Sequence, residues 1–134
     1  MANKHLVLAV DDEVSLCEFY EKTLPLLGYD AACAQSAKEA REAIQVRKPS
    51  LILMDIMMPG EDGIAFTREL RASANYSDIP IIVVSGLADA ATLNDALLFG
   101  AVDYIVKPVE IEALKTKIER AIVAVENRKK GKAS

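Results

Sequence analysis

Five polar residues of this sequence each follow a short apolar run, and their types allow them to do chemistry together. Asp11 and Asp12 follow the first run, Asp55 the third, Ser85 the fourth and Lys107 the fifth. If the runs are parallel strands, their carboxyl ends share one edge of a sheet, where binding sites form in such folds. We therefore expect three carboxylates, a hydroxyl and an ammonium to meet at that edge.

Such a group predicts a metal-assisted reaction of phosphate. Three carboxylates in one cleft repel one another and raise each other's pKa values, so they call for a cation. The ligands are hard oxygens, with no His or Cys among them, which favours magnesium. A carboxylate beside that ion can act as a nucleophile toward phosphorus. Lys107 would add a second positive charge, and Ser85 could donate a hydrogen bond to a phosphoryl oxygen.

The elements that must position these groups alternate along the chain. Apolar runs rich in Val, Ile and Leu predict strands at residues 6–10, 31–34, 51–54, 79–84 and 104–106. The runs are too continuous for half-exposed strands, so we expect each to be buried on both faces. Apolar residues at helical spacing predict helices at residues 16–27, 36–44, 62–70, 90–100 and 111–122. Five strands alternating with five helices predict a parallel sheet with right-handed crossovers and helices on both faces.

Individual residues refine the helices. Ser36 and Glu39 form a capping box at the start of the second helix. Pro25 lies inside the first helical pattern, where we expect it to kink or end the helix. In the fourth helix, Leu97 belongs with Ala90 and Leu93 to an inward stripe, which leaves Leu98 exposed as a candidate partner contact.

Charge and length limit the possible partners. The 134 residues suit one domain. Residues 1–126 hold all 20 acidic and 12 of the 16 basic residues, a net charge of −8, so we expect no direct binding of nucleic acid by this body. The basic residues of segment 127–134 form a solvated tail beyond the last helix or the start of a linker. We expect a natural end there, with a cut linker as the alternative.

Apolar runs and cysteines indicate the compartment. No run approaches the roughly 20 residues of a membrane-spanning helix, and the first run is too short for a signal peptide, so we expect a cytoplasmic protein with no membrane contact. Cys17 and Cys33 fit no metal-binding spacing. In a reducing compartment we expect them to be small apolar fillers, with a disulfide or a redox role as the rarer alternative.

The segments that carry the polar residues resemble a known family. Their order and sequences, over roughly residues 5–126, are similar to the receiver domain of two-component response regulators, in the CheY-like superfamily: Asp11-Asp12, DIMMPGEDG from Asp55 to Gly63, Val84-Ser85-Gly86, and GAVDYIVKP from Gly100 to Pro108. The resemblance implies a doubly wound, flavodoxin-like (βα)5 sandwich with strand order 2-1-3-4-5. It also implies a receiver domain over residues 1–126.

The resemblance implies roles for the site residues. Asp55 is the phosphorylated residue, Lys107 is its charged partner, and Lys107–Pro108 is a cis peptide bond. The implied magnesium ligands are Asp12, Asp55 and the backbone carbonyl of Met57, with Asp11 acting mainly through water. Ser85 and Tyr104 are the switch residues, which repack the face formed by helix four, strand five and helix five. Met57 and Leu87 occupy the two positions that tune phosphoryl lifetime, and because both are apolar we expect slow dephosphorylation.

The partners implied are a sensor histidine kinase or a histidine phosphotransfer protein, with a homodimer or an effector protein on the switching face. The domain would be a phosphoacceptor that assists its own phosphorylation and dephosphorylation, and no enzyme in the usual sense. One alternative is a small phosphohydrolase of the haloacid-dehalogenase type, which needs Asp-x-Asp after strand one, whereas Asp11-Asp12-Glu13 has the second acid out of register. A flavin-binding module would want a hydroxyl- and glycine-rich loop there.

Overall fold

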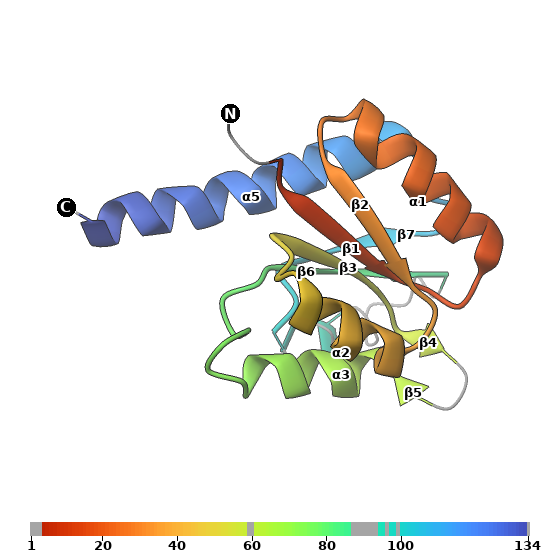
Figure 1. Cartoon of the computed structure of the whole chain (residues 1–134), viewed down its shortest axis with the longest axis horizontal. Coiled ribbons are helices and arrows are strands. Elements are labelled where there is room, and N and C mark those ends of the chain that lie inside the picture. Colours follow the sequence, from red (N-terminus) through yellow and green to blue (C-terminus); the bar gives the residue numbers. More distant parts are fainter. Residues whose placement is uncertain (1–3, 59–60, 87–93, 96, 99, 134) are drawn as a thin grey trace.

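A five-stranded parallel sheet forms the centre of the molecule (Figure 1). The computed structural model describes residues 4–58, 61–86, 94–95, 97–98 and 100–133. The strand order is β2-β1-β3-β6-β7, and the bounds are β1 Leu6–Val10, β2 Asp30–Ala34, β3 Leu51–Asp55, β6 Ile81–Ser85 and β7 Asp103–Val106. In chain order this is the predicted order 2-1-3-4-5. A short antiparallel pair, β4 Met57–Met58 and β5 Glu61–Asp62, follows β3.

Helices cover both faces of the sheet, as the alternating pattern predicted (Figure 1). On one face, α1 (Val14–Leu26) and α5 (Ile111–Ala133) pack through residues such as Tyr20, Leu114 and Ile118. On the other face, α2 (Ala37–Val46) and α3 (Gly63–Arg71) contribute Ile44 and Phe66. Successive residues of a strand point to opposite faces, so β1, β3 and β6 supply both clusters.

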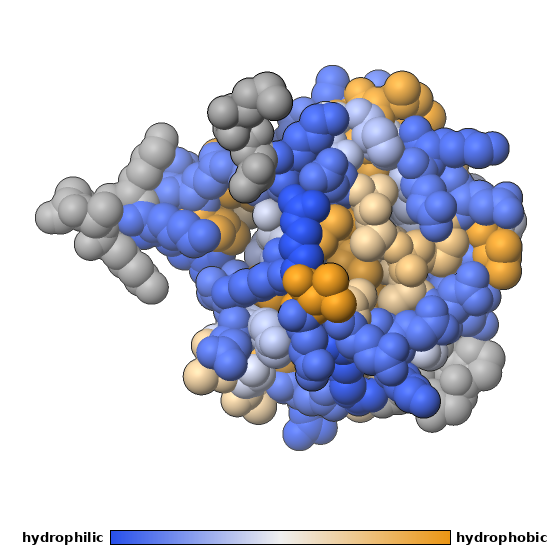
Figure 2. Space-filling view, viewed as in Figure 1, coloured by the Kyte–Doolittle hydropathy of each residue, from blue (hydrophilic) through white to orange (hydrophobic). Residues whose placement is uncertain are grey.

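The burial of the strands depends on their place in the sheet. All residues of the central strands β1, β3 and β6 are buried, as expected. The same expectation was wrong for β2 and β7, most of whose residues are half-buried, because each has a neighbouring strand on one side alone within the described sheet. Over β2, apolar residues gather near the middle of a largely hydrophilic face (Figure 2).

Helix ends follow the local signals. Helix α1 continues through Pro25 and ends at Leu26, close to the proline, as expected. The signal that closes it is Gly28, which has a φ of +98° and whose N–H donates to the Pro25 carbonyl. At the start of α2, the backbone N–H of Glu39 donates to Ser36 Oγ at 3.1 Å, and Glu39 Oε1 accepts from the Gln35 N–H. The Ser36 half of the predicted capping box is confirmed, whereas the Glu39 side chain reaches the N–H of Gln35 instead of that of Ser36.

The last helix is longer than expected. The prediction that it ends before residue 127 was wrong, because α5 continues to Ala133 and projects past the sheet (Figure 1). Basic residues near the end of a helix are favourable beside its negative dipole end, so the basic segment can continue the helix. Within α5, Glu126 Oε1 lies 3.0 Å from Nε2 of His5, the residue that precedes β1. None of the helices within the described ranges is long and apolar enough to cross a membrane.

Part of the predicted fourth helix lies outside the described residues, including Ala90 and Leu93. Asn94, Asp95, Leu97 and Leu98 are helical, and Gly100 follows with a φ of +114°. Leu98 is 80% exposed, as predicted, whereas Leu97, expected to face inward, is 40% exposed.

The two cysteines form a disulfide bond. Cys17 in α1 and Cys33 in β2 have Cα atoms 5.8 Å apart, within the usual range for a disulfide. The expectation of two reduced fillers was therefore wrong. Cys17 is buried, and Cys33 packs against the core on the α1 side of the sheet. Their spacing in the sequence gave no sign that the fold would bring the two sulfurs together.

Candidate metal and phosphoryl site

The predicted polar residues do meet at the carboxyl edge of the sheet. Asp55 and Ser85 are the last residues of β3 and β6, and Lys107 follows β7 directly. Asp11 follows β1, and its backbone N–H donates to the carbonyl of Ala34 at the end of β2. The parallel register places these strand ends beside one another, since Asp55 is paired with Val84 and Ser85 with Val106.

Three carboxylates form the centre of the site. Oxygens of Asp11, Asp12 and Asp55 lie within 4.8 Å of one another. Asp11 and Asp55 are buried, at 1% and 3% exposure, whereas Asp12 is exposed. Two buried carboxylates and an exposed third form an acidic cluster, called the acidic pocket below, which reaches solvent through Asp12.

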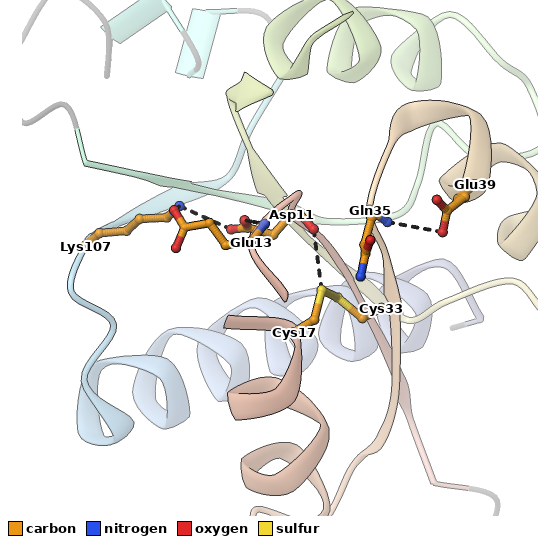
Figure 3. The surroundings of a disulfide bond; sticks show 7 residues. All are labelled: Asp11, Glu13, Cys17, Cys33, Gln35, Glu39 and Lys107. Carbon is orange, nitrogen blue, oxygen red and sulfur yellow. Dashed lines mark hydrogen bonds and ion pairs between the residues drawn. A yellow bond between two sulfur atoms is a disulfide. The ribbon is translucent and has the colours of Figure 1, made fainter. Parts of the chain in front are cut away.

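Lys107 balances part of this negative charge. Its Nζ lies 3.2 Å from Asp11 Oδ2, 3.6 Å from Asp55 Oδ2 and 3.0 Å from Glu13 Oε1. Figure 3 shows its side chain reaching toward Glu13 and Asp11. Burial alone would lower the pKa of Lys107, but the hydrogen bond to Glu13 and the charges of Asp11 and Asp55 outweigh burial and raise it. The lysine is therefore a fixed positive charge.

Glu13 is a site residue that the sequence reading did not assign. It lies two residues after Asp11 and hydrogen-bonds the lysine from the exposed side of the pocket. Its backbone N–H also donates to Asp11 Oδ1 at 2.9 Å, which orients that carboxylate. A third acid directly after the Asp11–Asp12 pair was the available signal.

The backbone of Lys107 is held at the edge of the sheet beside Ser85. Lys107–Pro108 is cis, as the resemblance implied. The backbone N–H of Lys107 donates to the Ser85 carbonyl at 2.8 Å, which continues the pairing of β7 with β6 past the last strand residue. This hydrogen bond fixes where Lys107 leaves the sheet.

The donor set fits magnesium. Asp11 Oδ2 is buried and, among the described residues, accepts no hydrogen bond of good geometry, although the Lys107 ammonium lies nearby. Burial raises the pKa of Asp11, against the opposing effects of the Glu13 N–H and Lys107. A buried carboxylate oxygen with capacity to spare, beside two further carboxylates, suits a hard divalent cation that also keeps some of its water.

This raised pKa predicts a stability effect. A raised pKa means that the folded state binds the Asp11 proton more tightly than the unfolded state, so Asp11 costs stability at neutral pH and the cost disappears as pH falls toward 3.8. Without magnesium, Asp11→Asn should raise the free energy of unfolding at pH 7 and lose this advantage in acid. Urea unfolding at several pH values measures it. A variant less stable than the wild type at pH 7 would contradict the prediction.

Gly63 allows the chain to pass close behind the acceptor strand. A Cβ atom at this buried position would lie 2.3 Å from the Asp55 carbonyl oxygen and 2.7 Å from the Ile56 Cα. Both are backbone atoms and cannot move aside cheaply. Any larger residue at Gly63 would therefore displace Asp55, which explains why this segment needs glycine at the start of α3.

The candidate switch residues lie on β6 and β7, the two strands that follow β3 in the order of the sheet. Ser85 is fully buried at the end of β6, and Tyr104 is half-buried in β7, packed against the cluster of Ile56, Val83 and Ala101. Lys117 of α5 contacts Tyr104 in two ways: its Nζ lies 4.6 Å from the centroid of the Tyr104 ring, and it donates a hydrogen bond to the Tyr104 carbonyl. The same Nζ lies 3.2 Å from Asp103 Oδ1. These contacts were missed, because nothing in the sequence singles out one lysine of α5.

Of the two lifetime positions, Met57 lies among the described residues. The backbone of Met57 forms part of β4, shortly after Asp55, and Leu87 lies outside the described residues.

Beside Lys107, α1 and the connection from β7 to α5 border an open hollow of about 570 Å³, lined by Glu13, Ser15, Leu16, Phe19, Lys107, Pro108 and Val109.

Comparisons with known proteins identify the family of this chain. The family model of the response regulator receiver domain matches residues 7–119. A probable transcriptional regulator ycf27 of Cyanophora paradoxa is 38% identical over 125 residues, which are 93% of this chain and 51% of the relative. The transcriptional regulatory protein ZraR of Escherichia coli strain K12 is 33% identical over 87% of this chain and 26% of its own length. The chain thus spans about half the length, or less, of the curated relatives it matches.

Solved structures give the same result. The chemotaxis protein CheY4 of Vibrio cholerae superposes with a TM-score of 0.83 at 28% identity, over 88% of this chain and 98% of that one. NtrX of Brucella abortus gives a TM-score of 0.88 at 29% identity, over 95% of this chain and 29% of the other. The family model matches residues 7–119, and the strand order and the acidic pocket are consistent with it. The chain belongs to the family of response regulator receiver domains.

Proposed function

We propose that this chain accepts a phosphoryl group on Asp55 from a sensor histidine kinase or a histidine phosphotransfer protein, with Mg²⁺ in the acidic pocket. The observation that carries the proposal is the convergence of Asp11, Asp12 and Asp55 within 4.8 Å, with the Lys107 ammonium beside them. A receiver domain of this family has a phosphoacceptor signalling role. We assign the receiver domain to residues 1–126.

The residues have distinct roles in the transfer. A carboxylate oxygen of Asp55 attacks phosphorus, the new O–P bond forms as the bond from phosphorus to the donor breaks, and the electron pair leaves with the donor. Lys107 stabilises charge on the transferring oxygens, and Ser85 donates a hydrogen bond to one of them. Bound Mg²⁺ would neutralise the remaining charge. Its holders would be Asp12, Asp55 and the Met57 carbonyl, with Asp11 acting mainly through water.

The hollow beside Lys107 is suited to the approach of a donor. It adjoins the lysine and offers Leu16, Phe19 and Val109 as apolar contacts. A partner helix that carries a phosphohistidine and is seated there would lie beside Lys107, whose Nζ is 3.6 Å from Asp55 Oδ2.

The signal would leave by a different face. Phosphorylation draws the Ser85 hydroxyl toward the phosphoryl group, and Tyr104 turns into the space that it leaves, which biases a two-state arrangement. The affected face comprises the fourth helix, β7 and α5. Its exposed apolar residues, which fit partner binding or dimerisation, are Leu97, Leu98, Val102, Val106 and Ile111. The acidic body makes direct nucleic-acid binding by this domain unfavourable.

We further propose that the protein works in the cytoplasm, where phosphorelay donors are found. No described helix spans a membrane. Curated relatives described as transcriptional regulators are longer than the matched region. The switching face would pass the signal on by contacting either a further segment of a longer protein or a separate effector protein.

Incubation with acetyl phosphate and magnesium tests the proposal. We expect one stable phosphoryl group per chain, located on Asp55 by mass spectrometry. Continuous turnover without a stable adduct would indicate the phosphohydrolase of the haloacid-dehalogenase type instead. Neither adduct nor turnover, with flavin bound from solution, would indicate the flavin-binding module.

Phosphoryl lifetime gives a second test. Met57 and Leu87 are apolar and cannot orient a water molecule for attack on the phosphoryl group. We therefore expect Leu87→Glu to speed dephosphorylation about tenfold, equivalent to about 1.4 kcal/mol of barrier. Decay of the phosphorylated protein after removal of acetyl phosphate measures the rate. The matched variant Leu87→Met, also apolar, should decay like the wild type, and an unchanged rate in Leu87→Glu would show that this position does not control lifetime.

A further inference from the structure

The Cys17–Cys33 bond lies next to Asp11 of the acidic pocket (Figure 3). Cys17 is in the first turn of α1 and is 3% exposed. Cys33 is half-buried in β2, the outermost strand on its side of the described sheet. The second sulfur is therefore the one that a small reagent reaches first.

The bond spans the same two elements that hold Asp11. Cys17 Sγ lies 3.4 Å from the carbonyl oxygen of Asp11 (Figure 3). From the other side, the Asp11 N–H donates to the carbonyl of Ala34, the neighbour of Cys33. The Cys17 N–H also donates to the Glu13 carbonyl. Residues 11–13, which carry three acids of the site, are thus hydrogen-bonded to the backbone of Ala34, next to Cys33, and to the backbone of Cys17.

We propose that Cys17 and Cys33 are a redox-sensitive thiol–disulfide pair whose state controls how firmly the segment of Asp11, Asp12 and Glu13 is held for Mg²⁺. The reversibility of the bond rests on the proposed cytoplasmic location, and the effect on Mg²⁺ rests on the proposed phosphoacceptor site. Disulfides in reducing compartments of mesophiles are usually transient and catalytic or redox-sensing, which favours a reversible bond over a permanent brace.

Hydrogen peroxide is the class of oxidant that suits the pair. The Cys33 sulfur attacks one peroxide oxygen, which gives a sulfenic acid and one water. The Cys17 sulfur then attacks the Cys33 sulfur and forms the S–S bond, and the expelled hydroxide takes the thiol proton as a second water. The two sulfurs lose two electrons, which peroxide gains. A cellular dithiol reverses the reaction by exchange and is itself oxidised to a disulfide.

The direction of the effect follows from repulsion among the acids. With the bond formed, the three carboxylates lie within 4.8 Å of one another. Reduction replaces the covalent tie with a weak hydrogen bond from the Cys17 thiol to the Asp11 carbonyl. Repulsion among the carboxylates can then move residues 11–13 away from Asp55. Part of the free energy of Mg²⁺ binding is used to bring them back, so the affinity falls. We therefore expect oxidised protein to bind Mg²⁺ about fivefold more tightly, at the lower end of couplings between linked sites.

The test compares the whole chain after treatment with peroxide and after treatment with a dithiol. Mass spectrometry with a thiol-blocking reagent should show two free thiols only after reduction. Calorimetric titration with Mg²⁺ should give the fivefold difference, and the amides of residues 11–13 should exchange hydrogen faster in the reduced protein. Cys33→Ser cannot form the bond and keeps Cys17, so it should behave like reduced wild type after either treatment, which also controls for methionine oxidation.

Each result decides the matter. Thiols that stay free in peroxide, or equal Mg²⁺ affinity together with equal exchange in the two forms, would overturn the inference. If neither form binds Mg²⁺, the proposed function fails at its metal site. The exchange rates then still decide the inference, because faster exchange on reduction supports the redox control of this segment and unchanged exchange removes it.

Discussion

An Asp55→Asn variant is expected to take up no phosphoryl group from acetyl phosphate in the presence of magnesium. The amide oxygen is a poor nucleophile toward phosphorus and carries no negative charge for the metal, so both requirements for transfer are lost. Intact mass spectrometry after incubation measures the adduct. Because Asp55 is buried beside Lys107, far-UV circular dichroism should confirm that the variant is folded.

The matched control is Asp78→Asn. Asp78 is exposed and pairs with Lys48, and both border a pocket with His5, before β1, remote from the carboxyl edge of the sheet. This variant removes one carboxylate without touching the site and should be phosphorylated at the wild-type rate. Uptake by Asp55→Asn at the same stoichiometry as the wild type would refute the assignment of the acceptor.

Lys107→Met is expected to have two opposite effects. The methionine keeps much of the apolar stem but removes the charge that faces Asp11 and Asp55. Loss of one group that stabilises transition-state charge should slow phosphorylation about a hundredfold, or about 2.7 kcal/mol. The same change should tighten Mg²⁺ binding, because the ammonium no longer competes for the carboxylates.

The combination distinguishes a catalytic lysine from a structural one. Phosphorylation rates and Mg²⁺ titrations of Lys107→Met are compared with those of Lys48→Met, which removes an exposed lysine paired with Asp78. The control should match the wild type in both measurements. A rate for Lys107→Met within twofold of the wild type would show that the lysine does not assist transfer.

Much of the fold and site could be predicted from local patterns. Apolar runs that alternate with helical periodicity define a parallel sheet, and the topology then requires the residues at the strand ends to meet. Asp11, Asp55, Ser85 and Lys107 were placed correctly for that reason. Pattern alone could not separate central from edge strands, since Ala31 and Ala32 are apolar whether or not a neighbour covers them.

The missed features depend on contacts between distant segments. The Cys17–Cys33 bond joins α1 to β2, and Lys117 of α5 reaches Tyr104 of β7. Neither pairing has a spacing rule, because each depends on how a helix lies on the sheet. The length of α5 was missed for a different reason: a basic, polar segment resembles a tail, yet basic residues are favourable at the end of a helix.

The most direct measurement of the central claim is a crystal structure of the protein soaked with magnesium and beryllofluoride, which mimics a phosphoryl group. We expect the metal between Asp12, Asp55 and the Met57 carbonyl, with the beryllofluoride joined to an Asp55 carboxylate oxygen and in contact with Lys107 and Ser85. An empty pocket, with the three acids turned away from one another at saturating concentrations of both reagents, would contradict the account.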